Sequence, residues 1–272
     1  GGLIMSTSAK SSARARIESV LDENSFVEIG ALVTARSTDF NIKAIDTPSD
    51  GVITGYGLIN GRLVYVFSQD SSVLGGSVGE MHAKKIASLY EKAMKMGAPV
   101  IGLIDCAGLR LQEATDALNG FGEIYKNMSL ASGIIPQITA VYGECGGGLA
   151  VLAELSDFVF VEEKKAKLFV NSPNALDGNY ESKLDTSSAK YMAEAGVADF
   201  IGDEETIANG VRQLVSMLPS NNAEGTVCTD NQDDLNRVCK DMEAEIADPA
   251  LALSDISDDG VFVEVKAEYA KE

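Results

Sequence analysis

The chain has 272 residues, of which 45% are hydrophobic, so it is long enough for one large domain or two small ones with a buried core. The formal net charge is −19, and residues 1–130 hold 12 basic and 14 acidic side chains whereas residues 131–272 hold 10 and 27. This acidic balance argues against nucleic-acid binding, which needs a basic face. The sequence has no apolar run long enough for a membrane span and no signal-peptide pattern, so we expect a cytoplasmic protein.

The cysteines give no sign of a metal or disulfide framework. Cys106, Cys145, Cys228 and Cys239 lie far apart, and no CxxC pair occurs. A zinc ribbon needs closely paired thiolates, and a small disulfide scaffold needs a higher density of cysteine. We therefore predict no metal site.

The first part of the chain predicts a helix followed by a hairpin. Residues 1–10 are expected to be a tag or a disordered segment, and residues 11–21 a short helix. Residues 25–33 are typical of a short extended segment. In residues 50–70, two β-branched apolar runs flank Asn60-Gly61, a dipeptide that suits a type I′ turn, so this stretch predicts a β-hairpin.

The next helix contains the tetrapeptide AMKM, residues 93–96, in which biotin carrier domains modify the lysine. Those domains place the lysine at the tip of a hairpin in a small all-β module. Here the apolar spacing predicts an amphipathic helix over residues 81–96, ended by Gly97 and Pro99. Lys95 then falls in the last turn, where a cation also suits the helix dipole. We therefore interpret Lys95 as a helix end and not as a biotin site.

The rest of the chain repeats the order strand, small-residue turn and helix, which is typical of an α/β fold. The last part, from residue 226, is acidic and is expected to be loosely structured until a final extended segment. We predict strands over residues 99–105, 134–143, 157–163 and 167–173, and helices over 109–132 and over 185–217 with a break near Gly196. Residues 144–155 are expected to be a glycine-rich turn that leads into a helix, residues 218–225 a loop, and residues 261–270 the extended segment.

Two small-residue turns that follow predicted strands are candidates for chemistry. They span residues 105–108 and 143–148 and are rich in glycine and alanine. Turns of this kind expose backbone N–H groups that can hold an oxyanion, and small residues let a ligand approach the backbone closely. Close packing of strand on helix explains the same pattern equally well.

Other candidate residues carry less weight. The single histidine, His82, begins a predicted helix without a nucleophile near it in sequence, so a core or capping role is favoured. Glu113 and Glu144 are the acids nearest the two turns, and we expect structural or surface roles for them; Asp157 is expected to be a turn residue. No GxSxG, HExxH or phosphate-binding-loop motif occurs.

Several motifs together carry a resemblance to a known family. "ARARIESVLDENSFVEIGALV", "DGVITGYGLINGRLVYVFSQDSSVLGGSVGEMHAKKI", "GAPVIGLIDCAGLRLQE" and "GVADFIGDEETIANGVRQLVSMLPSN" resemble, in order and spacing, the N-terminal half of biotin-dependent acyl-CoA carboxyltransferases. These include acetyl-, propionyl- and methylmalonyl-CoA carboxylases and decarboxylases. The resemblance implies a crotonase-like α/β fold, a spiral of repeated ββα units, over residues 11–225. It also implies that biotin arrives on a separate carrier protein.

The resemblance further implies a mechanism and a set of site residues. A carboxyl group moves between carboxybiotin and the α carbon of a short acyl-CoA through an enolate, and backbone N–H groups stabilise the enolate oxygen. By motif position the implied oxyanion donors are Ala107, Gly108, Gly147 and Gly148, and the implied CoA contacts are Gly75, Gly76, Ser77, Lys84 and Lys85; no metal is implied.

The sequence departs from the family pattern in places. Ala107 replaces the first glycine of the family's "DSGGAR" motif, although alanine keeps the N–H group, and Ser172-Pro173 replaces a "GP" loop. The glycines and histidine of a later family motif are missing around residues 183–196, and so is the CxxC zinc ribbon of the two-subunit bacterial acetyl-CoA carboxylase.

Complete carboxyltransferases carry a second domain that forms the biotin side of the site. Residues 226–272 are expected to be an acidic tail leading to that domain, either missing from this chain or encoded separately. The implied partners are therefore a carboxyltransferase C-terminal-domain subunit and a biotin carboxyl carrier protein, in a trimer or hexamer. A membrane would be involved only indirectly, through a decarboxylase pump.

Three alternatives remain open. "LRLQEATDALNGFGEIY" is similar to the smaller subunit of malonate decarboxylases, and a non-catalytic CoA-binding scaffold subunit would carry the same fold. A stand-alone crotonase hydratase is disfavoured because Leu149 and Ala150 occupy the positions where such enzymes carry an acid. The sequence leaves the acyl group, the direction of the reaction and the oligomeric state open.

Overall fold

The structure is a computed structural model that describes residues 11–36, 46–172, 184–225, 234, 236–239 and 247–271. The expectations for residues 1–10, Cys228 and Pro173 lie outside these residues. The chain divides into two compact units, one of residues 1–225 with 266–272 and one of residues 226–265. None of the helices described here has the length and apolar character to cross a membrane.

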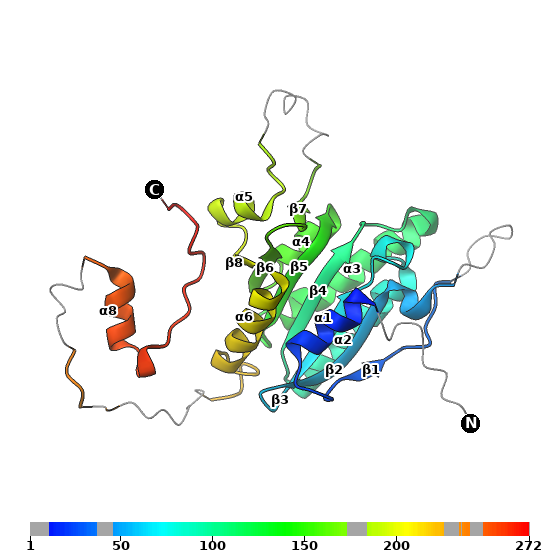
Figure 1. The fold of residues 1–272 in the computed structure, drawn as a ribbon. Coiled ribbons are helices and arrows are strands. Elements are labelled where there is room, and N and C mark those ends of the chain that lie inside the picture. Colours follow the sequence, from blue (N-terminus) through cyan, green and yellow to red (C-terminus); the bar gives the residue numbers. More distant parts are fainter. Residues whose placement is uncertain are drawn as a thin grey trace. The chain divides into compact units, whose positions relative to one another are not determined.

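The larger unit is built on one eight-stranded sheet with the order β1-β2-β3-β4-β5-β6-β8, while β7 pairs with β5 (Figure 1). The β1-β2 and β2-β3 pairs are antiparallel, and every later pair is parallel. The strands are β1 (Val27–Ile29), β2 (Val52–Ile59), β3 (Arg62–Gln69), β4 (Val100–Cys106), β5 (Gln137–Gly146), β6 (Phe158–Glu162), β7 (Lys167–Phe169) and β8 (Phe200–Gly202).

Helices cover both faces of the sheet, as a largely parallel sheet requires. One hydrophobic cluster packs α1 and α6 against the sheet, and a second packs α2, α3, α4 and α5 against the opposite face. The predicted α/β class is therefore confirmed. The helices are α1 (Ser12–Val20), α2 (Glu80–Met96), α3 (Ala114–Ala131), α4 (Gly148–Glu154), α5 (Ala189–Glu194) and α6 (Glu204–Met217), with α8 (Pro249–Ile256) in the smaller unit.

Local sequence signals explain the hairpin and the end of α2. Asn60 and Gly61 both have positive φ, 50° and 77°, as a type I′ turn between β2 and β3 requires. Gly97 ends α2 in the left-handed conformation, with φ 63°. Lys95 lies in the last turn of this helix, which confirms the prediction that it is a helix end.

Three expectations for the second half of the chain are wrong. Residues 185–217 are not one interrupted helix, because strand β8 separates α5 from α6 and pairs with β6 through Phe160 and Phe200. Residues 261–270 form no strand; they are irregular and end in turns. The acidic tail contains a helix, α8, that begins with the side chain of Asp248 accepting a hydrogen bond from the N–H of Ala250.

Candidate active site

The first predicted turn and the end of the second lie side by side at the carboxyl ends of β4 and β5. The bounds of the second turn were wrong, because β5 continues to Gly146 and pairs there with β7. Strands β4 and β5 are parallel neighbours, and Cys106 is in register with Cys145 near their carboxyl ends. The carboxyl ends of neighbouring parallel strands are where α/β folds bind ligands. The turn after Cys106 and the glycine run from Gly146 to Gly148 therefore face the same space.

That space is a pocket of about 760 Å³. Helix α3 lines it with one face, because Leu118, Phe121, Gly122 and Tyr125 recur at the spacing of successive helical turns. Tyr125 also donates a hydrogen bond of 2.6 Å from its hydroxyl to the carbonyl of Gly148, which fixes α3 against the start of α4. The remaining lining residues are Cys106, Ala107, Gly108, Leu109, Glu144, Gly146, Gly147, Gly148 and Phe169.

All four predicted oxyanion residues line this pocket, but their N–H groups differ in how they are bonded. The N–H of Ala107 donates to the carbonyl of Gly75 at 2.9 Å, and that of Gly147 donates to Phe169 at 2.9 Å. For the N–H of Gly108 the part of the chain that the structure describes supplies one acceptor, the sulfur of Cys106 at 3.3 Å. No acceptor is recorded among the described residues for the N–H of Gly148, which begins α4.

The cysteine thiols beside the turns are poorly suited to act as nucleophiles. Cys106 and Cys145 are both buried. Burial raises the pKa of the Cys106 thiol to about 12 and also raises the pKa of Cys145. Because the thiolate is the reactive form, both side chains are inert at neutral pH. Among the residues that the structure describes, His, Cys, Asp and Glu form no group of three able to hold a metal ion.

The predicted CoA loop, Gly75 to Ser77, packs behind the first turn and does not line the pocket. Besides the Ala107 bond, the N–H of Val78 donates to Gly108 at 2.9 Å and the N–H of Arg110 donates back to Val78 at 3.0 Å. A Cβ on Gly76 would lie 2.4 Å from the carbonyl oxygen of Asp105. Glycine is therefore required there for loop and turn to approach, and the loop sets the position of the turn.

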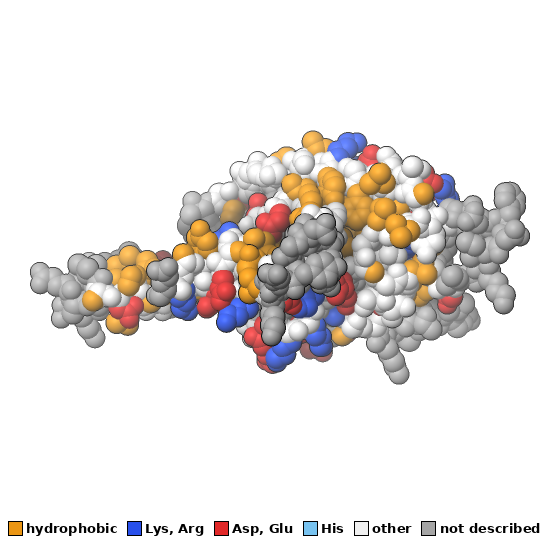
Figure 2. All heavy atoms as spheres, turned by 90° about the horizontal axis from the view of Figure 1, so that it is seen from above, with side chains coloured by type: hydrophobic (Ala, Val, Ile, Leu, Met, Phe, Trp, Pro, Cys, Tyr) orange, Lys and Arg blue, Asp and Glu red, His pale blue; other side chains and the backbone are white. Residues whose placement is uncertain are grey.

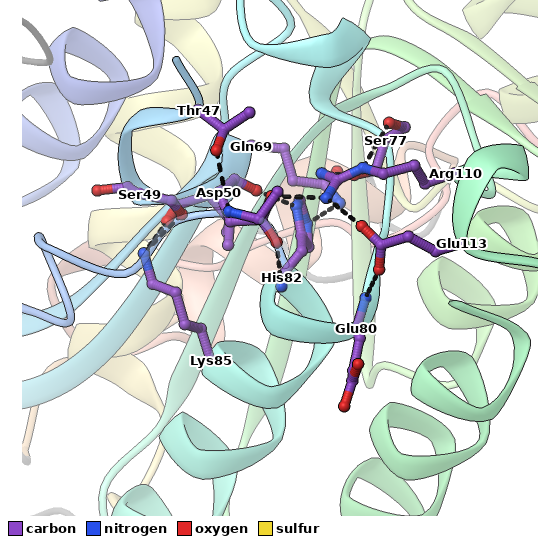
Figure 3. A network of polar contacts seen from close by, with 12 residues as sticks. Thr47, Ser49, Asp50, Gln69, Ser77, Glu80, His82, Lys85, Arg110 and Glu113 are labelled. Carbon is purple, nitrogen blue, oxygen red and sulfur yellow. Dashed lines mark hydrogen bonds and ion pairs between the residues drawn. The ribbon is translucent and has the colours of Figure 1, made fainter. Parts of the chain in front are cut away.

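A buried polar network holds these two loops together (Figure 3). The guanidinium of Arg110 bonds the carboxylates of Asp50 at 2.6 Å and Glu113 at 2.9 Å, and the carbonyl of Ser77 at 2.7 Å. Glu113 in turn accepts a hydrogen bond from the N–H of Glu80 at the start of α2. The expected structural role of Glu113 is confirmed, whereas the roles of Arg110 and Asp50 were not predicted. The arginine in the turn segment "AGLR" was the signal that could have pointed to a buried cation.

His82 belongs to the same network and not to the pocket. Its ring lies 3.0 Å from the carbonyl of Asp50 and 3.2 Å from the side-chain amide of Gln69. Burial and the nearby Arg110 lower the pKa of His82 to about 3, so the ring is neutral at physiological pH. Burial also raises the pKa of the Asp50 carboxyl, and Arg110 opposes that rise. The predicted core role of His82 is confirmed.

The two lysines predicted to meet CoA phosphates line a second, smaller pocket of about 220 Å³ between α2 and residues of β1 and β2. Lys84 is exposed and pairs with Glu80 at 2.6 Å. Lys85 is buried, and its ammonium donates to the carbonyls of Ser49, at 2.8 Å, and Val52. Burial lowers the pKa of Lys85 to about 8. The ammonium of Lys84 is therefore accessible to a phosphate, whereas that of Lys85 would first have to break its hydrogen bonds to the two carbonyls.

The family model of the carboxyl transferase domain matches residues 6–272, so the chain belongs to the carboxyl transferase domain family. It is 39% identical over 276 residues to methylmalonyl-CoA decarboxylase subunit alpha of Propionigenium modestum, across 97% of this chain and 53% of that protein. It is also 39% identical over 275 residues to the propionyl-CoA carboxylase beta chain of Roseobacter denitrificans, across 96% of this chain and 54% of the relative.

A solved structure of transcarboxylase 12S, a hexamer assembly with hydrolysed methylmalonyl-coenzyme A bound, superimposes with a TM-score of 0.88. The sequences are 32% identical, and the match covers 95% of this chain and 52% of that one. The resemblance to the family and the crotonase-like fold it implied are confirmed. The chain spans about half the length of the curated relatives it matches.

Proposed function

We propose that this chain is the acyl-CoA-binding half of a biotin-dependent carboxyltransferase, which moves a carboxyl group to or from the α carbon of a short acyl-CoA. The observation that carries the proposal is the pocket at the ends of β4 and β5, where Gly108 and Gly148 present backbone N–H groups without a backbone acceptor among the described residues. Membership in the carboxyl transferase domain family supports it.

The pocket suits a thioester that becomes an enolate. Its wall is mainly apolar, which excludes water and strengthens hydrogen bonds to developing charge. The N–H groups of Gly108 and Gly148 would hold the thioester oxygen, whose negative charge grows as the α-proton leaves. The N–H groups of Ala107 and Gly147 already donate to other carbonyls, so in this proposal they would fix the turns and would not contact the oxygen. Carboxybiotin on a separate carrier would supply the carboxyl group.

The curated relatives are about twice as long, so we expect a second carboxyltransferase domain to complete the site. Hydrophobic side chains gather on the face of the molecule shown in Figure 2. Three exposed apolar side chains lie near the pocket. Leu111, in the short 3-10 turn before α3, is 78% exposed, Leu118 of α3 is 62% exposed, and Val170, which follows the pocket residue Phe169, is 61% exposed. An exposed apolar rim around a pocket favours a docking surface for a carboxyltransferase C-terminal domain. The expected location is the cytoplasm.

Two further assignments belong to this proposal. Residues 11–225 would form the acyl-CoA-binding domain, and residues 226–272 would lead toward the second domain. Gly75, Gly76 and Ser77 would shape the pocket from behind, and Lys84 is the better placed of the two lysines for a CoA phosphate, since its ammonium is exposed.

Calorimetric titration with acetyl-CoA, propionyl-CoA, malonyl-CoA and free CoA tests the proposal. We expect acyl-CoA to bind more tightly than free CoA, since only the thioester reaches the two N–H groups. Equal binding of all four ligands would contradict an acyl site in the pocket. Acyl-CoA binding without carboxyl transfer, with the second-domain partner and carboxybiotin present, would instead support a scaffold subunit.

A further inference from the structure

Gly122 lies in the middle of α3, where glycine lowers the stability of the helix and no close packing contact requires it. Glycine destabilises a helix interior relative to alanine because the free chain loses more conformational freedom. The other glycines in the described helices have a close neighbour: a Cβ would lie 2.7 Å from Ala83 at Gly120, 2.7 Å from Tyr125 at Gly148 and 2.8 Å from Phe160 at Gly210. At Gly122 a Cβ would meet nothing within 4 Å.

Gly122 is exposed, and the open space beside it opens into the pocket. Gly122 lines the pocket together with Leu118, Phe121 and Tyr125, which lie on the same face of α3. On this face of α3, large side chains therefore flank Gly122, which has no side chain. Gly108 and Gly147 also line the pocket with no atom near a built Cβ, but their positive φ angles of 109° and 60° already require glycine. Gly122 is helical, so the backbone gives no such reason.

The gap lies next to the proposed oxyanion donors. Phe121 and Tyr125, the large neighbours of Gly122 on this face, both approach Gly148, whose carbonyl accepts the hydrogen bond from the Tyr125 hydroxyl at 2.6 Å. A thioester held by the N–H of Gly148 would therefore direct its acyl substituent along this face of α3. Of the lining residues on this helix, only Gly122 leaves room there.

We propose that Gly122 determines which acyl groups the pocket accepts, because its missing side chain leaves space for the α-substituent and the chain beyond it. This rests on the proposed function, since it takes the ligand to be an acyl-CoA. An added methyl group would occupy space that a propionyl or butyryl chain needs, whereas an acetyl group does not reach it. One methylene in an apolar pocket changes binding by about tenfold or more.

The test compares Gly122→Ala with a matched control, Ser129→Ala, on the same helix. Ser129 is exposed and does not line the pocket. Both substitutions favour the helix, so both variants should melt at a higher temperature than the wild type, by about 2–4 °C for Gly122→Ala and less for Ser129→Ala. A rise in melting temperature shows that neither variant is misfolded.

Calorimetric titration with acetyl-, propionyl- and butyryl-CoA then gives the decisive comparison. For Gly122→Ala we expect the Kd to rise about tenfold for butyryl-CoA and to stay within about twofold for acetyl-CoA. Ser129→Ala should bind all three as the wild type does. Unchanged affinities in Gly122→Ala, or equal weakening for every acyl group, would overturn the inference. A wild-type protein that binds no acyl-CoA more tightly than free CoA would overturn the proposed function itself, and the inference with it.

Discussion

Arg110 and Asp50, 60 residues apart in the chain, form an ion pair of 2.6 Å whose side chains are 2% and 0% exposed. The pair joins the turn that follows β4 to the segment before β2. The same guanidinium bonds Glu113, three residues further on, and Ser77, so one side chain connects three segments of the chain.

Removing Arg110 should be strongly destabilising. Arg110→Met would leave two buried carboxylates, Asp50 and Glu113, without their counter-ion, and the free energy of unfolding should fall by about 3–5 kcal/mol. Lys84→Met removes an exposed partner of Glu80 and should cost less than about 1 kcal/mol. Urea denaturation of the three proteins measures both losses. Equal losses in the two variants would show that the Arg110 pair is not buried in solution.

The single histidine should not titrate in the physiological range. The pKa of His82 is lowered to about 3, mainly by burial, so its ring should remain neutral at about pH 5 to 8 in the folded protein. Proton NMR of the imidazole signals over this range should show no shift. A titration midpoint near 6.5, the ordinary value, would place His82 in contact with water.

The same lowered pKa gives a pH dependence of stability. Below pH 6.5 the unfolded chain takes up a proton on His82 that the folded protein does not, so the folded state loses stability as pH falls from 6.5 toward about 3. The expected slope from this group is about 1.4 kcal/mol per pH unit. Denaturant unfolding of the wild type and His82→Gln at a series of pH values isolates it, because the variant lacks this group. Parallel stability curves for the two proteins would contradict the prediction.

Two glycines with positive φ should respond very differently to alanine. Gly61, with φ 77°, has nothing within 4 Å of a built Cβ, so Gly61→Ala should lower stability by about 1–2 kcal/mol, the strain of the left-handed conformation. Gly76, with φ 64°, adds an overlap with the backbone of Asp105 at 2.4 Å. Gly76→Ala should therefore cost about 3 kcal/mol or more and weaken ligand binding, because the loop behind the turn must move. Denaturant unfolding and ligand titration of both variants test this prediction. Similar losses of stability in the two variants would show that the loop around Gly76 can shift at little cost.

Much of the fold could be predicted from local signals in the sequence. Asn60-Gly61 predicts the hairpin and Gly97 the end of α2, because each depends on the conformation of one or two residues. Strand β8 has only three residues and pairs with β6 far along the chain, so helical spacing around it concealed it. Pairing between distant segments is decided by tertiary contacts that periodicity does not contain.

The same distinction applies to the candidate site. Glycine-rich turns after two strands can be recognised in the sequence, and they do meet in one pocket. Which N–H groups remain available could not be predicted, because the acceptors for Ala107 and Gly147 come from Gly75 and Phe169 on other loops. The oxyanion-donor role of the four turn residues stays a prediction. Of the four, Gly108 and Gly148 are the ones whose N–H groups have no backbone acceptor among the described residues.

The most direct test of the central claim follows the carbonyl carbon of bound [1-¹³C]propionyl-CoA by NMR. Gly148→Pro removes the N–H group at the first residue of α4, where a helix tolerates proline, and Gly148→Ala adds the same Cβ beside Tyr125 but keeps the N–H. The account predicts a downfield shift of the carbonyl signal on binding to the wild type and to Gly148→Ala, and loss of that shift in Gly148→Pro. A carbonyl signal that stays at its free position in the wild type, or that shifts equally in all three proteins, would contradict the claim that the N–H of Gly148 holds the thioester oxygen.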